Sequence, residues 1–249
     1  MGQGSPCVEV GRVRGLLVAT VVIATGCSHH RPRTTEIPGP YDRPVLIAVA
    51  PALNFSGSSD FDPVQVADIL ASELTMVEGV QVVGVNRVMA VLAQDGAKSV
   101  SSPVHALNIC ERIGCDGIIV FAVTEYDAYT PVVGMAVQLY MRSPDRAGDR
   151  FDPVVASREA SPFPVEAPDD SPLRPRAQVQ RVYNGSHNVI AEAVERYARD
   201  RSTDEGALGW RRYLKSQRLY VRFCCWSAIN EMMGQEYHRM MARAADHQE

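Results

Sequence analysis

The sequence predicts an α/β domain in which helices pack on a small mixed sheet, followed by a helical C-terminal extension. Three observations predict this fold class. Short apolar runs at residues 45–50, 80–85 and 116–125 are typical of buried strands. Helix-start signals stand between these runs, and residues 133–141 alternate between large apolar and smaller or polar side chains with the period of two that a strand requires. Strands that alternate with helices along a chain favour a layered α/β architecture.

The first strand and helix are predicted at the start of a domain that spans residues 45–160. The apolar run 45–50 ends at Pro51. Asp62 then precedes Pro63, and Gln65 stands at the third helical position, a combination that is typical of a helix start. Apolar residues follow at helical spacing until Gly79, where we expect the helix to end.

The following elements are predicted in the same way. Residues 80–85 are expected to form the second strand, Asn86 to cap a helix over residues 87–94, and Ser102 with Pro103 to begin a third helix that ends near Gly114. The third and fourth strands are predicted at residues 116–125 and 133–141, and a further strand at about residues 154–158.

The last third of the chain is predicted to be a linker and a helical region. Residues 161–177 are rich in proline and predict a linker, with a partner-binding strip as the alternative. Residues 178–249 are predicted to be helical, with one helix over 178–199, irregular near Asn184 and Gly185, and a longer one over 208–245 that Gly234 could kink.

The composition excludes several classes of protein. The 249 residues are 46% hydrophobic and 22% charged, as in globular proteins. The formal net charge of −4 argues against a general nucleic-acid binder, because such a protein needs a broad basic surface to neutralise phosphates. No run of about 20 apolar residues occurs, which excludes a polytopic membrane protein.

Residues 1–26 are predicted to be a lipoprotein signal peptide. Arg12 and Arg14 precede an apolar or small-residue stretch over residues 15–26 that is too short to span a bilayer. The stretch runs into the sequence ATGC at residues 24–27, which resembles a bacterial lipobox. This resemblance implies that Cys27 is acylated with fatty acids such as palmitate and becomes the mature N-terminus. Two alternatives are that Cys27 lies by chance beside an ordinary signal-peptidase site and that the segment is a plain N-terminal membrane anchor, which the shortness of the apolar stretch disfavours.

The segment after the cysteine is predicted to be a tether. Residues 27–44 are rich in proline and contain almost no large apolar side chain, so we expect an extended chain that lifts the domain off the membrane. Many Gram-negative lipoproteins carry an aspartate after the cysteine as an inner-membrane retention signal. Ser28 stands there instead, which by this analogy favours the outer membrane, with the domain facing the periplasm.

Three ordered blocks resemble a known type of envelope domain. Residues 49–57 (VAPALNFSG), 82–94 (VVGVNRVMAVLAQ) and 113–126 (IGCDGIIVFAVTEY) look like the CsgG and TolB-amino-terminal type, to which LpoB-like domains belong. The resemblance implies lipoproteins or periplasmic proteins that act as scaffolds, secretion components or activators of wall synthases. The function predicted is a non-catalytic envelope lipoprotein that binds other periplasmic or outer-membrane proteins.

Two alternatives from other classes remain. The alternating strand at residues 132–141 favours a CsgG-like oligomeric secretion component, and homo-oligomerisation is left open. An envelope hydrolase is the other alternative. Ser186 and His187 are adjacent, yet neither a nucleophile elbow nor a glycine-rich nucleotide loop is present. We therefore predict no catalytic residue and no cofactor.

A run of basic residues is the candidate contact surface. These residues recur at steps of three and four in the predicted C-terminal helix and would form one stripe, which could meet anionic headgroups, wall polymer or an acidic partner. An ordinary solvated helix face is the alternative. The stripe consists of Arg211, Lys215, Arg218 and Arg222, and Arg212 lies beside it.

The cysteines allow a disulfide but do not require one. Cys110 and Cys115 flank a predicted helix end in a chain predicted to be exported, so a bridge between them is left open. The adjacent Cys224 and Cys225 would form a strained ring if bridged and are expected to pack separately. No metal site is predicted, because the cysteines lack zinc-site spacing and the histidines are scattered.

Overall fold

The computed structural model of the chain describes residues 1–2, 36–142, 171, 173–201 and 206–246. The described residues from Glu36 onward belong to one compact unit. Cys27, the strand predicted at residues 154–158 and most of the proline-rich segment lie outside the described residues. No helix in the described part of the chain combines the length and the apolar character needed to cross a membrane.

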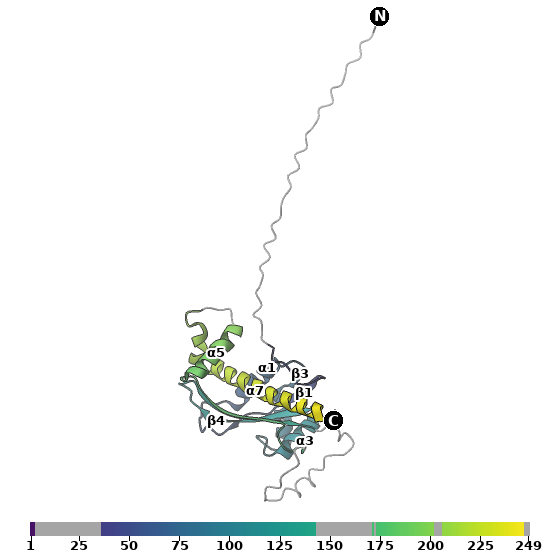
Figure 1. The fold of residues 1–249 in the computed structure, drawn as a ribbon, viewed down its shortest axis with the longest axis vertical. Coiled ribbons are helices and arrows are strands. Elements are labelled where there is room, and N and C mark those ends of the chain that lie inside the picture. The colour runs from purple at the N-terminus through teal and green to yellow at the C-terminus, as the bar shows by residue number, and fades with distance from the viewer. Residues whose placement is uncertain (3–35, 143–170, 172, 202–205, 247–249) are drawn as a thin grey trace, which may run out of the picture. The chain divides into compact units, whose positions relative to one another are not determined.

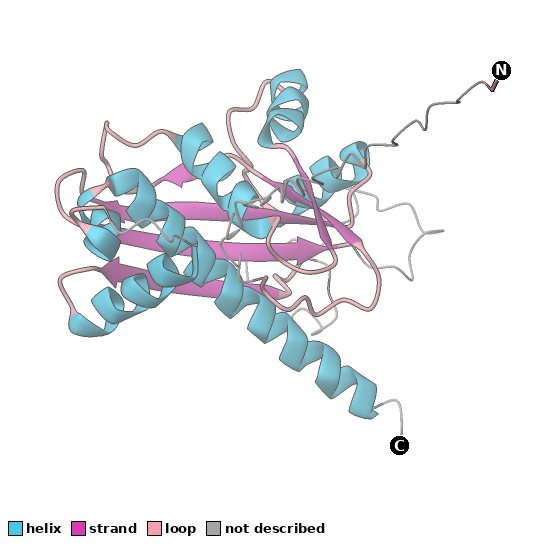
Figure 2. Ribbon diagram, turned by 90° about the horizontal axis from the view of Figure 1, so that it is seen from above, coloured by secondary structure: helices cyan, strands magenta, loops and turns pink. Residues whose placement is uncertain are grey.

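The centre of the fold is a mixed six-stranded sheet with the order β3-β1-β4-β5-β6, in which β2 lies beside β4 (Figure 2). β1 pairs in parallel with β3 and β4, whereas β4, β5 and β6 are antiparallel neighbours. The α/β fold predicted from the sequence is therefore confirmed. The strands are β1 (Val45–Val49), β2 (Leu53–Asn54), β3 (Val80–Val83), β4 (Gly117–Tyr126), β5 (Val132–Met141) and β6 (Ala177–Asn184).

Helices cover both faces of the sheet. On one face lie α1 (Pro63–Leu74) and the long helix α7 (Gln217–Asp246), with α5 (Asn188–Arg201) packed beside α7 (Figure 1). On the other face lie α2 (Val85–Gln94) and α3 (Pro103–Ile113). The short helices η2 (Gly209–Arg211) and α6 (Arg212–Lys215) precede α7.

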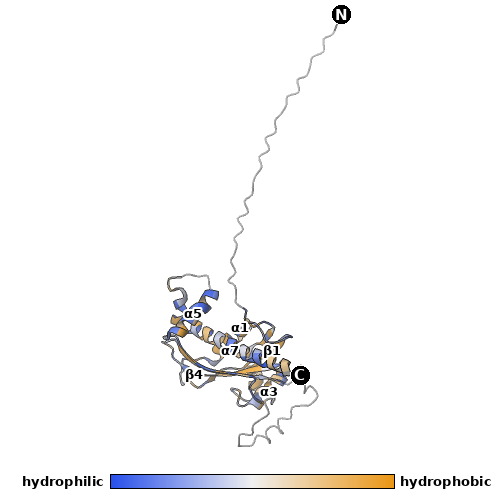
Figure 3. Cartoon of the chain, viewed as in Figure 1, coloured by the Kyte–Doolittle hydropathy of each residue, from blue (hydrophilic) through white to orange (hydrophobic). Residues whose placement is uncertain are grey.

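The alternation of side chains along the strands divides the interior into two cores. In β1, Ile47 and Val49 point to the α7 side, and Ala48 points to the α3 side. Figure 3 shows apolar residues concentrated along the sheet. The α7-side core is the larger one and contains a group of aromatic side chains, namely Tyr183, Tyr197, Tyr213, Tyr220, Phe223 and Trp226.

The helix boundaries follow the signals in the sequence. The Asp62 carboxylate accepts hydrogen bonds from the backbone N–H groups of Val64 and Gln65, at 2.9 and 3.1 Å, and so caps α1. The Ser102 hydroxyl caps α3 in the same way. Gly114 ends α3 with φ +79°, a conformation that disfavours any residue with a Cβ atom.

The predicted cap of α2 is wrong. The helix begins at Val85, one residue before Asn86, and its N-cap is Gly84, which has no side chain to donate or accept a hydrogen bond. β3 runs into α2 through this one extended residue, so Asn86 already lies inside the first turn. The two-residue strand β2 was not predicted, since so short a segment has no periodicity.

The helix predicted over residues 178–199 is half wrong, because its first part is strand β6. Val179 and Tyr183 are buried, whereas Gln178, Gln180 and Arg181 are exposed, and β6 pairs with β5 over its whole length. The helical spacing that suggested the prediction, formed by Ile190, Val194 and Tyr197, belongs only to α5.

The predicted C-terminal helix over residues 208–245 is not continuous. Ser216 has an extended backbone, with φ −105° and ψ 111°, and separates α6 from α7. The apolar residues on either side of Ser216 keep a helical spacing. This spacing alone therefore does not predict that the helix is interrupted at Ser216.

Part of the predicted tether packs on the fold. Ile37 is buried, its N–H donates to the Met76 carbonyl at 2.9 Å, and its carbonyl accepts from the Glu78 N–H at 2.9 Å. The packed domain therefore begins before residue 45, the predicted boundary. Ile37 is the large aliphatic residue of this segment, and its burial offsets the cost of fixing the chain around it.

The alternating strand β5 is a core strand. It is hydrogen-bonded to β4 on one edge and to β6 on the other, and its apolar side faces the α7-side core. Packing against helices explains the alternation that suggested a secretion component.

Candidate functional site

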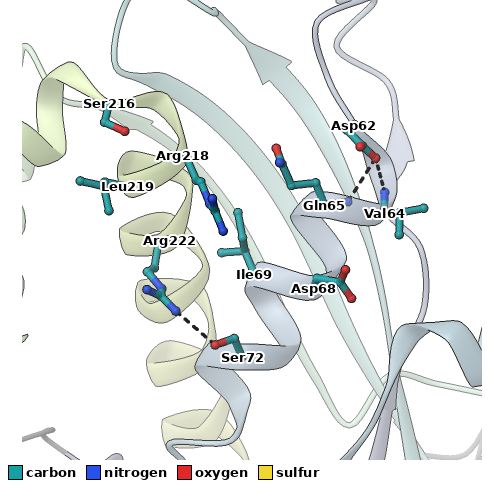
Figure 4. A pocket seen from close by; sticks show the side chains of 10 residues that line it. All are labelled: Asp62, Val64, Gln65, Asp68, Ile69, Ser72, Ser216, Arg218, Leu219 and Arg222. Carbon is teal, nitrogen blue, oxygen red and sulfur yellow. Dashed lines mark hydrogen bonds between the residues drawn. The ribbon is translucent and has the colours of Figure 1, made fainter.

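A groove with a volume of about 660 Å³ lies between α1 and the first turns of α7 (Figure 4). One wall comes from α1 and its capping residue, and the other from α7 and the residue before it. The walls combine aliphatic side chains with acids, amides, hydroxyls and guanidinium groups. The lining residues are Asp62, Val64, Gln65, Asp68, Ile69, Ser72, Ser216, Arg218, Leu219 and Arg222.

The two walls are joined by a buried carboxylate. Glu73 of α1 is only 1% exposed, and its Oε1 lies 2.8 Å from the Arg222 Nε of α7. Its Oε2 lies 2.9 Å from the Arg201 Nη2 of α5, at ion-pair distance. Arg222 also donates from its Nη2 to the Ser72 hydroxyl at 3.2 Å, as Figure 4 shows. One acid on α1 therefore holds two other helices.

The electrostatics of this ion triad reflect its burial. Burial raises the pKa of Glu73 above its ordinary range, and the two guanidinium groups act in the opposite direction. Arg201 also lies over the Tyr197 ring, with 4.5 Å between the guanidinium carbon and the ring centroid. A buried carboxylate that lost either arginine would be poorly compensated, so the triad fixes the distance between α1, α5 and α7.

Two charged groups in the groove are available to a partner. Arg218 and Asp68 are exposed, and neither has an ion-pair partner among the residues that the structure describes. Asp62, by contrast, is occupied as the cap of α1. Figure 4 shows Arg218 and Arg222 reaching from α7 toward α1. The groove thus offers a free cation on one wall, a free anion on the other and aliphatic surface between them.

The structure distributes the five predicted basic residues over three elements. Arg211 lies in η2 over the Trp210 ring, Arg212 begins α6 beside the Tyr213 ring, and Lys215 ends α6. Because the chain is extended at Ser216, these residues do not share a helix with the other two.

The two members on α7 have different roles. Arg218 and Arg222 both line the groove. Arg222 is paired with the buried Glu73, whereas Arg218 is exposed. Of these two arginines, Arg218 therefore combines a place in the groove with a charge that has no ion-pair partner in the described part of the chain.

A second polar cluster runs along α3, from the residues before its start to its last turn, and faces Asp95 at the end of α2. The Arg112 Nη1 is 2.6 and 2.7 Å from the two Asp95 carboxylate oxygens. The His105 Nε2 is 3.7 Å from Asp95 Oδ2, and its Nδ1 is 3.1 Å from the Ser101 hydroxyl. Ser101, His105 and Asp95 therefore lie in a row in space. The sequence does not predict this arrangement, because the three residues are not adjacent in it.

These contacts fit a structural role better than the catalytic site of a hydrolase. The Asp95 charge is neutralised by Arg112, and the Ser101 backbone N–H also approaches the same His105 nitrogen, at 3.3 Å. A catalytic serine needs a base oriented by a free carboxylate and donors for an oxyanion. Ser186 and His187, noted in the sequence, lie in a turn where the Ser186 N–H donates to Asn184 Oδ1 at 3.0 Å.

Sequence reasoning missed Glu73 and Arg201. A signal for Glu73 was present, because it follows Ile69 and Leu70 at steps of four and three on the apolar side of α1. A charged residue on an apolar stripe predicts a buried partner. No comparable signal marks Arg201, since its partner lies far away in the sequence. No group of three or more His, Cys, Asp or Glu side chains suited to a metal ion occurs within the described ranges.

Comparisons with known proteins give distant structural likenesses only. No protein-family description matches the sequence, and no curated protein matches it. The lipoprotein GNA1162 from Neisseria meningitidis has a TM-score of 0.39 at 18% identity, over 67% of this chain and 89% of that chain. The LpoB C-terminal domain from Salmonella enterica has a TM-score of 0.34 at 15% identity, over 40% of this chain and 73% of that chain. E. coli LpoB has a TM-score of 0.35 at 12% identity, over 55% of this chain and 76% of that chain. Values of this size leave the activity and partners of this chain undefined.

Proposed function

We propose that this chain is a non-catalytic adaptor of the bacterial envelope. Cys27 carries the lipid that anchors it, the α/β domain faces the periplasm from the outer membrane, and the groove between α1 and α7 binds another envelope protein. The division into signal peptide, tether, α/β domain, linker and C-terminal region belongs to this proposal, with the two differences noted above at Ile37 and β6.

The anchoring part is supported by the order of segments at the N-terminus. A basic start, a short apolar stretch and the residues ATGC come in the order that lipoprotein export requires. Several acyl chains on one cysteine contribute about 0.8 kcal/mol per buried CH₂, enough for nearly permanent attachment. The proline-rich segment that follows provides reach between the lipid and the domain.

The binding part is carried by one observation, the open groove with rigid walls and a free charge on each wall. The Glu73 triad already fixes α1 against α7, so a partner would lose little free energy in ordering the site. Arg218 and Asp68 would give the complex orientation, and the aliphatic parts of Val64, Ile69 and Leu219 would give it area.

Metabolic labelling tests the anchor. Cells that express the full chain with labelled palmitate should yield a labelled, membrane-bound protein, whereas Cys27→Ala should remain unlabelled and leave the membrane fraction. Cys7→Ala, which changes a cysteine inside the signal peptide, is the matched control and should still be labelled. An unmodified thiol on the processed N-terminus, or a Cys27→Ala protein that stays on the membrane, would contradict the proposal.

Site-specific crosslinking in intact cells tests the groove. A photoreactive residue at position 68, in the groove, should link the chain to a discrete envelope protein, whereas the same residue at Arg87 on the opposite side of the sheet should not. Arg218→Glu should reduce the crosslink at least tenfold, since it reverses the free charge. Arg196→Glu, an exposed arginine of α5, serves as the charge-matched control. Equal crosslinking from positions 68 and 87 would place the contact elsewhere.

A further inference from the structure

Two buried thiols meet where α3 turns into β4. Cys110 lies in the last turn of α3, and Cys115 lies two residues before Gly117, the first residue of β4. The Cys110 Sγ is 2.9 Å from the Cys115 Sγ, and both side chains are buried in the α3-side core. Their neighbours in this core include Ala48, Ile118 and Tyr140.

The backbone holds the two cysteines in this arrangement. The Cys110 carbonyl accepts hydrogen bonds from the N–H groups of both Gly114 and Cys115, each at 3.0 Å. This is the bond pattern of a helix that ends through a left-handed glycine, here Gly114 at φ +79°. The turn therefore brings Cys115 back beside the last turn of α3 without any contribution from the thiols.

The distance favours covalent closure. A disulfide has an S–S length of about 2.05 Å, so the two sulfurs need to approach by only about 0.9 Å, which small side-chain rotations can supply. Cys224 and Cys225 provide the contrast within the same chain. Both are fully buried in the α7-side core, and adjacent residues of a helix point in different directions.

We propose that Cys110 and Cys115 form a disulfide that staples the C-terminus of α3 to the start of β4. The site is a modification site of the fold itself. It rests on the export of the chain in the proposed function, but not on the adaptor role. The oxidant is an exchangeable disulfide, such as oxidised glutathione or the disulfide of a thiol–disulfide oxidoreductase, which the exported compartment of a bacterium supplies.

The disulfide forms in two successive thiol–disulfide exchanges. The exchange takes place while the end of α3 is open, before folding or after a local opening, because both thiols are buried in the closed fold. The Cys115 thiolate attacks one sulfur of the oxidant, a mixed disulfide forms, and the first thiolate leaves and takes up the proton that Cys115 has lost. Cys110 then loses its proton and attacks the Cys115 sulfur, and the second thiolate leaves and takes up that proton. Two cysteine thiols are oxidised and one disulfide of the oxidant is reduced to two thiols. The hydrogen bond from the Cys110 thiol lowers the pKa of Cys115, which favours Cys115 as the first nucleophile.

The test is the mapping of cysteine states after folding under defined redox conditions. The full chain is reduced in denaturant, refolded in a buffer of reduced and oxidised glutathione, blocked with an alkylating reagent and digested. The expected result is a linked pair of peptides that contain Cys110 and Cys115, with Cys224 and Cys225 alkylated. Recovery of Cys110 and Cys115 as thiols or as glutathione adducts in protein with native circular dichroism would overturn the proposal.

A second measurement removes the dependence on refolding. Protein isolated in native, reduced form is incubated in the same glutathione buffers, and its thermal midpoint is recorded with and without reductant. The oxidised wild type should melt at a higher temperature than its reduced form, and the difference should vanish in the variant with Cys110→Ala and Cys115→Ala. Cys224→Ala is the matched control and should keep the difference. A shift that survives in the double variant would overturn the assignment. Failure of palmitate labelling would leave these results unchanged, so the two proposals can fail separately.

Discussion

The two faces of the sheet use the same kind of ion pair in different surroundings. On the α7 side, Glu73 is 1% exposed and contacts Arg222 at 2.8 Å and Arg201 at 2.9 Å. On the α3 side, Asp95 contacts Arg112 at 2.6 Å, with 31% and 35% of the two side chains exposed. The contact lengths are similar. The Glu73 carboxylate is far less exposed to water than the Asp95 carboxylate, and the Arg201 side chain is 13% exposed, whereas that of Arg222 is 45% exposed. Burial, not contact length, should decide what each pair contributes.

The difference also separates the candidate site from the scaffold. The buried triad holds three helices on the face that carries the groove. The exposed pair merely links the end of α2 to the end of α3. We therefore expect substitutions on the α7 side to change both stability and the shape of the groove, and substitutions of the α3-side pair to change little.

The largest effect is expected from the aromatic group under α7. Phe223 is fully buried and contacts the rings of Tyr183, Tyr197 and Tyr220 at centroid distances of 6.0, 5.7 and 6.0 Å. Phe223→Ala should lower the free energy of unfolding by about 3–5 kcal/mol, because it removes a buried ring and leaves a cavity. Urea denaturation measures the change. Met89→Ala, at an exposed position of α2, should cost far less, and equal costs would show that the two faces do not differ as described.

The next largest effect tests the comparison of the ion pairs directly. Arg201→Ala should lower the free energy of unfolding by about 3 kcal/mol, since it leaves Glu73 buried with one of its two cations missing. Arg112→Ala is the matched substitution on the other face and should cost less than about 1 kcal/mol. The same denaturation experiment measures both. Similar losses in the two variants would mean that burial does not control these pairs.

A smaller effect is expected from pH. Burial raises the folded-state pKa of Glu73, whereas the unfolded value is about 4.3. The raised pKa contributes stability that is fully present below the unfolded value and is lost as pH rises through the folded value, because the unfolded chain releases its proton first. Relative to Glu73→Gln, the wild type should therefore lose unfolding free energy as pH rises from about 4. A relative gain over the same range would show that the two arginines outweigh burial.

Local signals were sufficient for most of the first half of the domain. Asp62 with Pro63, Ser102 with Pro103 and Gly114 act within one helical turn, so the sequence places them without any knowledge of the fold. The strands β1, β4 and β5 were also located correctly from apolar runs and alternation. The helix predicted over residues 178–184 is wrong, because the helical spacing that predicts it comes from the residues of α5 that follow.

The candidate site was predicted less well than the fold. The spacing predicts the same role for Arg218 and Arg222. In the structure, Arg218 lies in the groove without an ion-pair partner among the described residues, whereas Arg222 forms an ion pair with Glu73. Nothing in the spacing separates these roles. The difference depends on α1, which lies about 150 residues earlier and meets α7 only in the folded protein.

By itself, the sequence determined the α/β class, the caps of α1 and α3 and the turn at Gly114, because each depends on residues within a few positions of one another. Only the tertiary structure decided that Glu73 joins three helices, that the groove opens between α1 and α7, and that the Cys110 and Cys115 sulfurs face each other in a buried core. Long-range contacts pair side chains whose separation along the chain carries no information about their separation in space, and burial then fixes the strength of each contact.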